Sequence, residues 1–404
     1  MTTPKLSHRG HDAPASPIRR LAPLATAARA RGVTVHPLNI GQPDIPTPEV
    51  MLAAYRSYDE KVIAYAPSDG YDWYRQRLAV HYTALAAEGG GPAVGAEDIV
   101  VTVGGSEALL FVLGAVCDPG DDILVCEPFY TNYAGFAHLL GVGVRAVRTL
   151  ASEGFRIDPA RVEAAIGPRT RALVLPSPGN PTGVVLSRGE LVALAELCRR
   201  RGIFFVSDEV YREFVYDLPE GSRAPSVLGL TGFEEQTVVI DSVSKRYSAC
   251  GARIGALVTK NRELRSAALR FGQARLSPAT VDQFAASAAL DTPAAYFRDV
   301  VQEYRARRDV LVDGLHGIGV GCIRPEGAFY LVATLPITDS DDFCRFLLED
   351  FELERETVML APATGFYATA GLGKDEARIA YVLDQARLVR SVRILGAALE
   401  RYRR

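Results

Sequence analysis

The stretch DIVVTVGGSEALLFVLGAVCDPGDDILVC, residues 98–126, decides the fold class of this 404-residue chain. Two short runs rich in β-branched residues, Asp98–Val103 and Asp122–Cys126, flank an apolar stretch of helical length, Ser106–Cys117. Runs that are apolar on both faces and that alternate with helices are typical of a parallel sheet covered on each side. We therefore predict a strand–helix–strand unit at the start of a mostly parallel sheet.

The same alternation continues along the chain to residue 240. Each further apolar run is short enough for a strand, and longer stretches of helical character separate the runs. The predicted strands are Val142–Val147, Arg171–Leu175, Ile203–Ser207 and Val238–Ile240, and the predicted helices are Asn132–Leu140 and Ser187–Arg201. The chain is thus predicted to be an α/β protein with a large domain whose mostly parallel sheet is flanked by helices.

A different pattern occupies both chain ends. Residues 1–15 are expected to form a loose tail, and Ser16-Pro17 to start a helix that ends at Gly32. Near the other end we predict helices at Pro293–His316, Asp341–Phe351 and from Asp384, and strands at Gly327–Leu335, Thr357–Ala361 and Arg378–Leu383. This mixture predicts a smaller α+β domain built from both ends, with residues 1–45 joining 291–404 and residues 46–290 forming the large domain.

Composition and charge exclude several classes of protein. With 48% hydrophobic and 23% charged residues, the chain matches an ordinary globular protein. The net charge of −3 gives no field that attracts polyanions, so nucleic acid is not an expected partner. The longest uncharged apolar stretch, around Ala108–Cys117, is too short to span a membrane, and the first residues lack the apolar segment of a secretory signal.

The cysteines and histidines suggest a reducing compartment and no metal. The six cysteines lie far apart, without a C-x-x-C pair, and the six histidines lack the spacing of metal ligands. We therefore expect a cytoplasmic location and no metal site.

Polar residues follow four of the predicted strands, where ligands of open α/β sheets bind. Gly104-Gly105-Ser106 can place backbone N–H groups around a phosphate, although Gly-Gly before a helix is as often plain turn chemistry. PSPGNPTG, residues 176–183, holds Asn180 in a rigid turn that could equally just reverse the chain. Asp208, in Ser207–Tyr211, is either a paired buried carboxylate or a helix cap. The fourth place is DSVSKRY, residues 241–247.

The lysine of this last stretch is the most informative residue. Lys245 follows an apolar strand, and buried ammonium groups shift their pKa and become nucleophiles. Together with Arg253, the four places supply a phosphate cradle, a carboxylate, an amide, a tyrosine and an imine-forming lysine. Pyridoxal 5′-phosphate requires this set. From about Ser16 to the C-terminus the chain resembles the fold-type I pyridoxal-phosphate enzymes, specifically the class I/II aminotransferases of the aspartate-aminotransferase-like branch.

The resemblance implies roles for the residues around the cofactor ring. Lys245 carries the Schiff base (aldimine) with the cofactor and then acts as general acid and base between Cα and C4′. Asp208 pairs with the pyridine nitrogen and keeps it protonated. Asn180 and Tyr211 bind the ring 3′-oxygen. Tyr130 stacks on the ring, unless it is simply a core aromatic.

The resemblance also implies a phosphate site and a dimer. The phosphate is expected to bind Gly105, Ser106, Ser242, Ser244 and Arg253, which combine backbone donors, hydroxyls and a guanidinium. Tyr65, in AYAPSDG, residues 64–70, matches a tyrosine that reaches the phosphate of the neighbouring subunit. A homodimer with shared active sites follows.

The remaining residues concern the substrate. Arg378 matches an arginine that binds the substrate α-carboxylate with two parallel hydrogen bonds, which lysine could not reproduce. Gly41 matches a loop that closes over the same group, and Asn180 belongs to this set as well. Arg275 of the partner could bind a distal carboxylate, which makes aspartate and glutamate candidate donors.

The expected function is transfer of an amino group between an L-amino acid and a 2-oxo acid. The same residues also support lyase, decarboxylase, oxidase or carbon–carbon bond-forming chemistry, because the cofactor makes the carbanion and the pocket decides its fate. A third interpretation is a regulatory module that only binds the cofactor. Such modules usually carry an appended helix-turn-helix, for which ordered motifs from residue 16 leave no room.

Overall fold

The computed structural model describes residues 3–219 and 221–402. Its largest sheet has the strand order β2-β8-β7-β6-β5-β3-β4. β8 runs antiparallel to both of its neighbours, and the other neighbouring pairs are parallel. The seven strands are β2 (Ile99–Thr102), β3 (Asp122–Glu127), β4 (Gly143–Arg148), β5 (Thr170–Pro176), β6 (Phe204–Asp208), β7 (Thr237–Ser242) and β8 (Gly255–Val258). The predicted mostly parallel sheet is confirmed.

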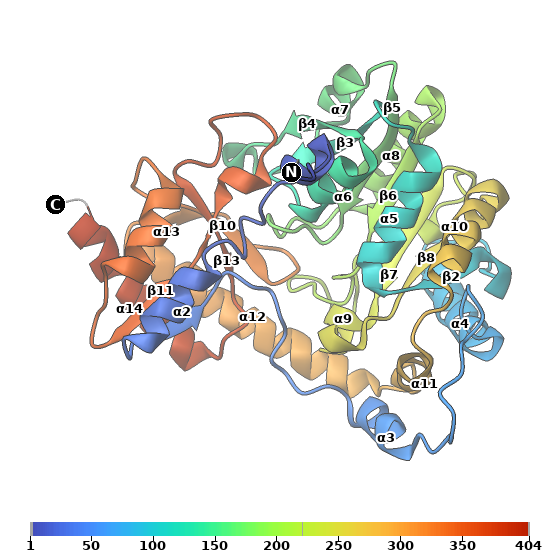
Figure 1. Cartoon of the computed structure of the whole chain (residues 1–404), viewed down its shortest axis with the longest axis horizontal. Helices are drawn as coiled ribbons and strands as arrows, with labels where there is room; N and C mark the ends of the chain where they lie inside the picture. Colours follow the sequence, from blue (N-terminus) through green and yellow to red (C-terminus); the bar gives the residue numbers. More distant parts are fainter. Residues whose placement is uncertain (1–2, 220, 403–404) are drawn as a thin grey trace.

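Helices cover both faces of this sheet (Figure 1). Along β5, Leu173 and Leu175 enter one hydrophobic cluster while Ala172 and Val174 enter another, because successive strand residues point to opposite faces. The first cluster includes residues of α4 (Asp72–Glu88), α7 (Pro159–Ala165), α8 (Arg188–Arg201) and α11 (Thr280–Ala289), and the second includes residues of α5 (Gly104–Val116), α6 (Asn132–Leu140) and α10 (Arg262–Arg275). α3 (Glu49–Ser57) lies beyond α11 at the lower edge of Figure 1.

The two chain ends share a separate core. Leu21, Val35 and Leu38 belong to the same buried cluster as Phe343 and Leu395. β1 (Thr34–Pro37) pairs in parallel with β11 (Glu356–Met359), and a second, antiparallel sheet has the order β12-β13-β10-β9. The other elements of this part are α2 (Ala22–Ala30), β9 (Gly321–Cys322), β10 (Tyr330–Thr334), β12 (Ala361–Pro362), β13 (Glu376–Ala380), α12 (Ala294–Gly317), α13 (Ser340–Glu349) and α14 (Gln385–Tyr402). The domain boundaries near residues 45 and 290 stay a prediction.

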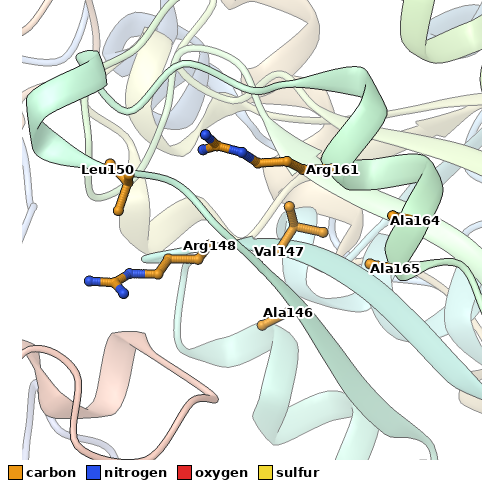
Figure 2. Close-up of a pocket in the computed structure, with 7 residues that line it drawn as sticks. All are labelled: Ala146, Val147, Arg148, Leu150, Arg161, Ala164 and Ala165. Atoms are coloured by element: carbon orange, nitrogen blue, oxygen red, sulfur yellow. The ribbon is translucent and has the colours of Figure 1, made fainter.

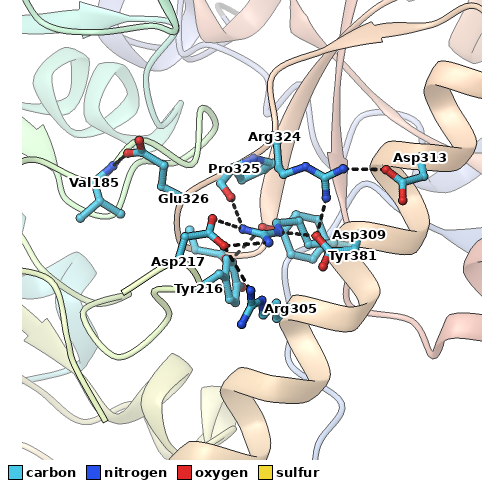
Figure 3. Close-up of polar contacts among 12 residues, drawn as sticks. Val185, Tyr216, Asp217, Arg305, Asp309, Asp313, Arg324, Pro325, Glu326 and Tyr381 are labelled. Atoms are coloured by element: carbon cyan, nitrogen blue, oxygen red, sulfur yellow. Dashed lines mark hydrogen bonds and ion pairs between the residues drawn. The ribbon is translucent and has the colours of Figure 1, made fainter. Parts of the chain in front are cut away.

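A buried arginine of α12, Arg308, ties the two parts together, and Figure 3 shows its neighbours Asp217, Pro325 and Tyr216. Arg308 donates to Asp217 Oδ2 at 2.6 Å and to the Pro325 carbonyl at 2.9 Å. Its guanidinium carbon lies 5.0 Å from the centre of the Tyr216 ring. Since Tyr216 and Asp217 follow strand β6 and its polar turn, this contact connects the edge of the large sheet to the part formed by the chain ends.

Three details differ from the predictions. The helix expected from Ser16-Pro17 starts at Ala22 in the structure, because the Ser16 carbonyl accepts from the backbone of Arg19 and Arg20 in a turn. In the tail, His8–His11 forms a short helix, α1, and residues 1–2 lie outside the described residues. The expected strand Thr357–Ala361 is divided between β11 and β12, which belong to different sheets.

Strand β8 was not predicted. It follows β7 after only the short helix α9 (Val243–Arg246) and a turn, so no helical crossover marks it in the sequence. No helix within the described ranges is long and apolar enough to cross a membrane.

Candidate active site

A cavity of about 640 Å³ opens at the carboxyl ends of the parallel strands. Segments that follow β2, β3, β5, β6 and β7 line it, together with residues from both chain ends. All of the predicted site residues except Tyr65 and Arg275 line this cavity: Gly41, Gly105, Ser106, Tyr130, Asn180, Asp208, Tyr211, Ser242, Ser244, Lys245, Arg253 and Arg378. Ligand sites of open α/β sheets occur at this edge.

Lys245 lies on α9, directly after β7, and is partly buried. Its ammonium group Nζ donates to the Gly41 carbonyl at 2.9 Å and lies 3.6 Å from Cys250 Sγ. Gly41 must be glycine here, because a Cβ atom at this position would lie 1.8 Å from the Tyr330 hydroxyl. The lysine therefore points into the cavity, where a carbonyl substrate or cofactor can reach it.

Buried charges hold the turn that carries Lys245. Asp241 Oδ1 accepts from the Ser242 backbone at 2.8 Å, and its Oδ2 accepts from Arg246 at 2.7 Å and from Tyr82 at 3.0 Å. Burial opposes ionisation of Asp241, but the charges of Arg246 and Arg212 outweigh it and lower its pKa to about 2. Both carboxylate oxygens of Asp241 therefore have hydrogen-bond partners. These bonds hold Ser242 and Arg246, which lie on either side of Lys245 in the sequence.

Asp208 ends β6 and is 9% exposed. Its Oδ2 accepts from the Tyr133 hydroxyl at 2.8 Å, while Oδ1 is buried without a hydrogen-bond partner among the described residues. Burial raises the pKa of Asp208 to about 6, against the lowering effect of the Tyr133 hydrogen bond. An acceptor left unsatisfied in a buried site fits a ligand that brings its own N–H donor.

Arg378 lies on β13 and is 2% exposed. Its NH1 donates to Asn180 Oδ1 at 3.1 Å, and its NH2 donates to the Asn39 carbonyl. The guanidinium lies over the Tyr330 ring at 4.5 Å and over the Phe366 ring at 5.0 Å. Burial lowers the pKa of Arg378, its Nε has no hydrogen-bond partner, and no carboxylate pairs with it within the described part of the chain. A buried guanidinium without a counter-ion favours a bound carboxylate.

A second group of residues in the cavity is suited to an anion. Gly104, at φ +68°, begins α5, and a Cβ on it would lie 2.6 Å from Arg253 NH2. Ser242 Oγ donates to Ser244 Oγ at 2.8 Å, and Arg253 NH1 lies 3.5 Å from the latter. Backbone N–H groups at a helix start, hydroxyls and a guanidinium together suit a phosphate dianion.

Tyrosine side chains form a further part of the cavity wall. The Tyr211 and Tyr330 hydroxyls share a hydrogen bond of 2.9 Å, and burial keeps the pKa of Tyr211 well above its ordinary value. The Tyr130 ring meets the Tyr133 ring edge to face at 5.5 Å. Burial raises the pKa of Tyr130 to about 12.

These residues fit pyridoxal 5′-phosphate. The unpartnered Asp208 Oδ1 suits a protonated ring nitrogen, the cradle at Gly104 and Arg253 suits a phosphate, and Lys245 lies in the same cavity. In the described residues no group of three or more His, Cys, Asp or Glu side chains is placed to hold a metal ion.

Tyr65 and Arg275 do not line this cavity. The Tyr65 side chain is 78% exposed. Arg275 Nε donates to Glu107 Oε1 at 3.1 Å, and its guanidinium lies 5.9 Å from the Phe111 ring centre. Both were expected to act on the site of a partner subunit, so their roles stay predictions.

Several residues that line the cavity were not predicted from the sequence. Tyr133 lies three residues after Tyr130, and its backbone N–H donates to the Tyr130 carbonyl at 3.0 Å in the turn that leads into α6, so its closeness to Tyr130 in the sequence was a signal. Tyr330 comes from strand β10 and Arg19 from the turn that precedes α2, and neither had a local signal. Asn132 and Cys250 also line the cavity.

A second, shallower hollow of about 520 Å³ lies between β4 and α7 (Figure 2). Its lining consists of Ala146, Val147, Arg148, Leu150, Arg161, Ala164 and Ala165. It contains none of the predicted site residues and no nucleophile or carboxylate.

Known proteins resemble the chain over almost its whole length. Residues 33–394 match the family described as aminotransferase class I and II. An aspartate/prephenate aminotransferase of Thermus thermophilus is 35% identical over 94% of this chain and 98% of its own. A probable N-acetyl-LL-diaminopimelate aminotransferase of Bacillus subtilis is 34% identical over 87% of this chain and 86% of its own.

A solved structure shares the fold. The aspartate aminotransferase of Thermus thermophilus with maleate superposes with a TM-score of 0.88 at 31% identity, and the match covers 98% of this chain and 100% of the other. All of these relatives are aminotransferases by name, so a different fate of the carbanion is not favoured. The chain therefore belongs to the class I and class II aminotransferases, the pyridoxal-phosphate-dependent enzymes of fold type I.

Proposed function

We propose that this enzyme binds pyridoxal 5′-phosphate at Lys245 and moves an amino group between an L-amino acid and a 2-oxo acid, with aspartate and glutamate as candidate donors. The observation that carries the proposal is that Lys245, the unpartnered oxygen of Asp208 and the uncompensated charge of Arg378 all face one cavity. When bound, the cofactor supplies an electron sink for the bond that breaks at the substrate Cα.

The other proposed roles, which are binding the cofactor and moving the proton, belong to residues of this chain. Lys245 attaches the cofactor and carries the proton between the substrate and the cofactor. Asp208 pairs with the ring nitrogen, and Asn180 and Tyr211 orient the ring oxygen. Gly105, Ser106, Ser242, Ser244 and Arg253 hold the phosphate. Tyr130 packs against the ring face.

Arg378 and Gly41 orient the substrate. The guanidinium binds the α-carboxylate, and its position is held by Asn180, by the Asn39 carbonyl and by the Tyr330 ring. A substrate fixed in this way presents its Cα to the side of the cavity on which Lys245 lies.

A homodimer with shared active sites is part of the proposal. Val62, Ile63 and Tyr65 are 73%, 68% and 78% exposed. Thr280 Oγ1 donates to the Ala64 carbonyl at 2.6 Å, which ties this apolar segment to the region of the exposed Leu276. Contiguous exposed apolar residues are typical of protein interfaces. In this arrangement Tyr65 of one subunit reaches the phosphate in the other.

The test of the proposed activity is a half-reaction screen. The purified enzyme is mixed with common amino acids, and released 2-oxo acid and pyridoxamine phosphate are measured, followed by addition of 2-oxoglutarate. We expect one or more donors to convert the cofactor to the amine form and 2-oxoglutarate to restore it. An altered amino acid without pyridoxamine phosphate would instead establish a lyase, decarboxylase or related activity.

The shared site is tested with mixed dimers. Lys245→Ala and Tyr65→Ala subunits are combined, and the hybrid is compared with each parent. If the site is shared between subunits, the hybrid contains one native active site. In that site, the Tyr65→Ala subunit supplies the intact Lys245 and the Lys245→Ala subunit supplies the intact Tyr65. If hybrids are no more active than the Tyr65→Ala parent, Tyr65 does not act across subunits.

A further inference from the structure

Arg19 brings a positive charge to the cavity that nothing in the described chain neutralises. Its side chain is exposed and lines the cavity, and no hydrogen bond or ion pair joins its guanidinium to any residue of 3–219 or 221–402. The adjacent Arg20, by contrast, forms an ion pair with Asp341. Two neighbouring arginines therefore have different environments, and only one of them has a protein partner.

The backbone around Arg19 is held in place. Ile18 packs against the buried cluster of Ala361, Ala363 and Phe366, and its carbonyl accepts from Asn39 Nδ2 at 2.8 Å. With Arg20 paired to Asp341, both neighbours of Arg19 are anchored. The position of Arg19 at the mouth of the cavity is thus a property of the fold.

Arg19 and Arg378 line the same cavity, and the charges of both act on the Tyr130 hydroxyl. Asn39 joins the two segments, because its side chain donates to Ile18 while its carbonyl accepts from Arg378. The Phe366 ring likewise contacts the Ile18 cluster and lies under the Arg378 guanidinium at 5.0 Å. These shared neighbours place Arg19 close to the position proposed for the α-carboxylate at Arg378.

The other charges of the cavity already have proposed partners. Lys245 attaches the cofactor, Arg253 faces the phosphate and Arg378 faces the α-carboxylate. Asp208, whose carboxylate lines the same cavity, faces the ring nitrogen. Arg19 is the lining cation that remains after this assignment.

We propose that Arg19 recognises a second acidic group at the far end of the substrate side chain. The inference rests on the proposed function and adds the residue that selects the substrate. A carboxylate accepts charge-assisted hydrogen bonds from a guanidinium, and these are stronger than bonds between neutral groups. Amino acids and 2-oxo acids with a second carboxylate are therefore favoured over those with one.

Arg275 of the same chain is not equivalent to Arg19. Its guanidinium already pairs with Glu107 at 3.1 Å, and it does not line the cavity. A paired arginine must break its ion pair before it can bind a substrate, whereas Arg19 has none to break.

The test compares Arg19→Gln with the matched variant Arg20→Gln in the pyridoxal-phosphate-loaded enzyme. KM and kcat are measured for L-aspartate, L-glutamate and L-alanine. The dissociation constants of succinate and propionate, which carry two carboxylates and one, are measured as a readout that needs no turnover. We expect Arg19→Gln to raise the KM for the acidic donors and the dissociation constant of succinate about tenfold or more, with alanine and propionate little changed.

Three results would overturn the inference. The first is an Arg19→Gln variant in which the KM values for alanine and aspartate change equally. The second is a wild-type enzyme that shows no preference for acidic donors. The third is an Arg20→Gln variant that raises the KM for acidic donors as much as Arg19→Gln does. Failure of the proposed function looks different, because no amino acid is then transaminated by wild type or variant. Reversal of preference toward amino acids with basic side chains in Arg19→Glu would support the inference further.

Discussion

The Tyr133 hydroxyl donates to Asp208 Oδ2 at 2.8 Å, and this bond leaves the other carboxylate oxygen unpartnered in the cavity. Tyr133 is completely buried, and its ring packs edge to face against Tyr130. One side chain therefore positions both the carboxylate expected at the ring nitrogen and the aromatic ring expected on the cofactor face.

Tyr133→Phe should weaken cofactor binding about tenfold, because the carboxylate loses a hydrogen bond to its charged form. The pKa of Asp208 is about 6 with Tyr133 present, and removal of the donor raises it. The carboxylate binds the ring nitrogen when ionised, so affinity falls as the pH drops through this pKa. In the variant that decline moves to higher pH. The measurement is the dissociation constant of pyridoxal phosphate from the apoenzyme as a function of pH.

Tyr304→Phe provides the control for that experiment. Tyr304 is also fully buried, but its hydroxyl has no hydrogen-bond partner among the described residues and lies in the core of the chain ends. Its removal should leave the pH dependence of cofactor binding unchanged. An unshifted profile in Tyr133→Phe would show that the bond does not tune Asp208.

Arg378→Lys should raise the KM for every amino donor about 10- to 100-fold. Lysine keeps the charge but loses the planar pair of donors and the contacts with the Tyr330 and Phe366 rings. Steady-state kinetics with acidic and neutral donors measure the effect. The control is Arg145→Lys, which alters a partly exposed pair with Asp122 on β3. Unchanged KM values in Arg378→Lys would remove the α-carboxylate from this position.

Asp241→Asn should destabilise the protein by about 3–5 kcal/mol, because Arg246 and Arg212 lose the buried carboxylate that they share and keep only Glu213 and Glu209 as partners. The pKa of Asp241 is about 2 in the folded protein, below the ordinary 3.8. Its contribution is thus complete at neutral pH and is lost as the pH falls from about 4 toward 2. Urea unfolding at several pH values should show a difference between wild type and variant that narrows below about pH 4.

A surface change serves as the reference for Asp241→Asn. Asp313→Asn removes one side of an exposed ion pair with Arg324, and such pairs contribute about 0–1 kcal/mol. If Asp241→Asn costs no more than this reference, the buried network does not hold the lysine turn.

The large sheet was predictable because its parallel strands are short apolar runs and helices separate most of them along the chain. Lys245, Asp208 and Asn180 could be placed in one cavity for the same reason, since the carboxyl ends of such strands meet at one edge. Strand β8 escaped prediction because it returns antiparallel without a crossover helix. Arg19 and Tyr330 escaped because the packing of the two chain ends against the sheet, and no local pattern, brings them to the cavity.

The prediction that a helix starts at Ser16-Pro17 was wrong for a physical reason. Serine before proline is a good helix start in isolation. Here Pro17 is buried against Gly365, and the chain turns at residues 16–20 before α2 begins. Tertiary packing therefore outweighed the local preference, and it placed Arg19 at the cavity.

The most direct test of the central claim is to find which residue carries the cofactor. The enzyme is loaded with pyridoxal phosphate, reduced with borohydride, digested and analysed by peptide mass spectrometry. We expect the phosphopyridoxyl mass on the peptide that contains Lys245, and a Lys245→Ala protein without it. A label on Lys260 or another lysine, or no label at all in an active enzyme, would contradict the assignment.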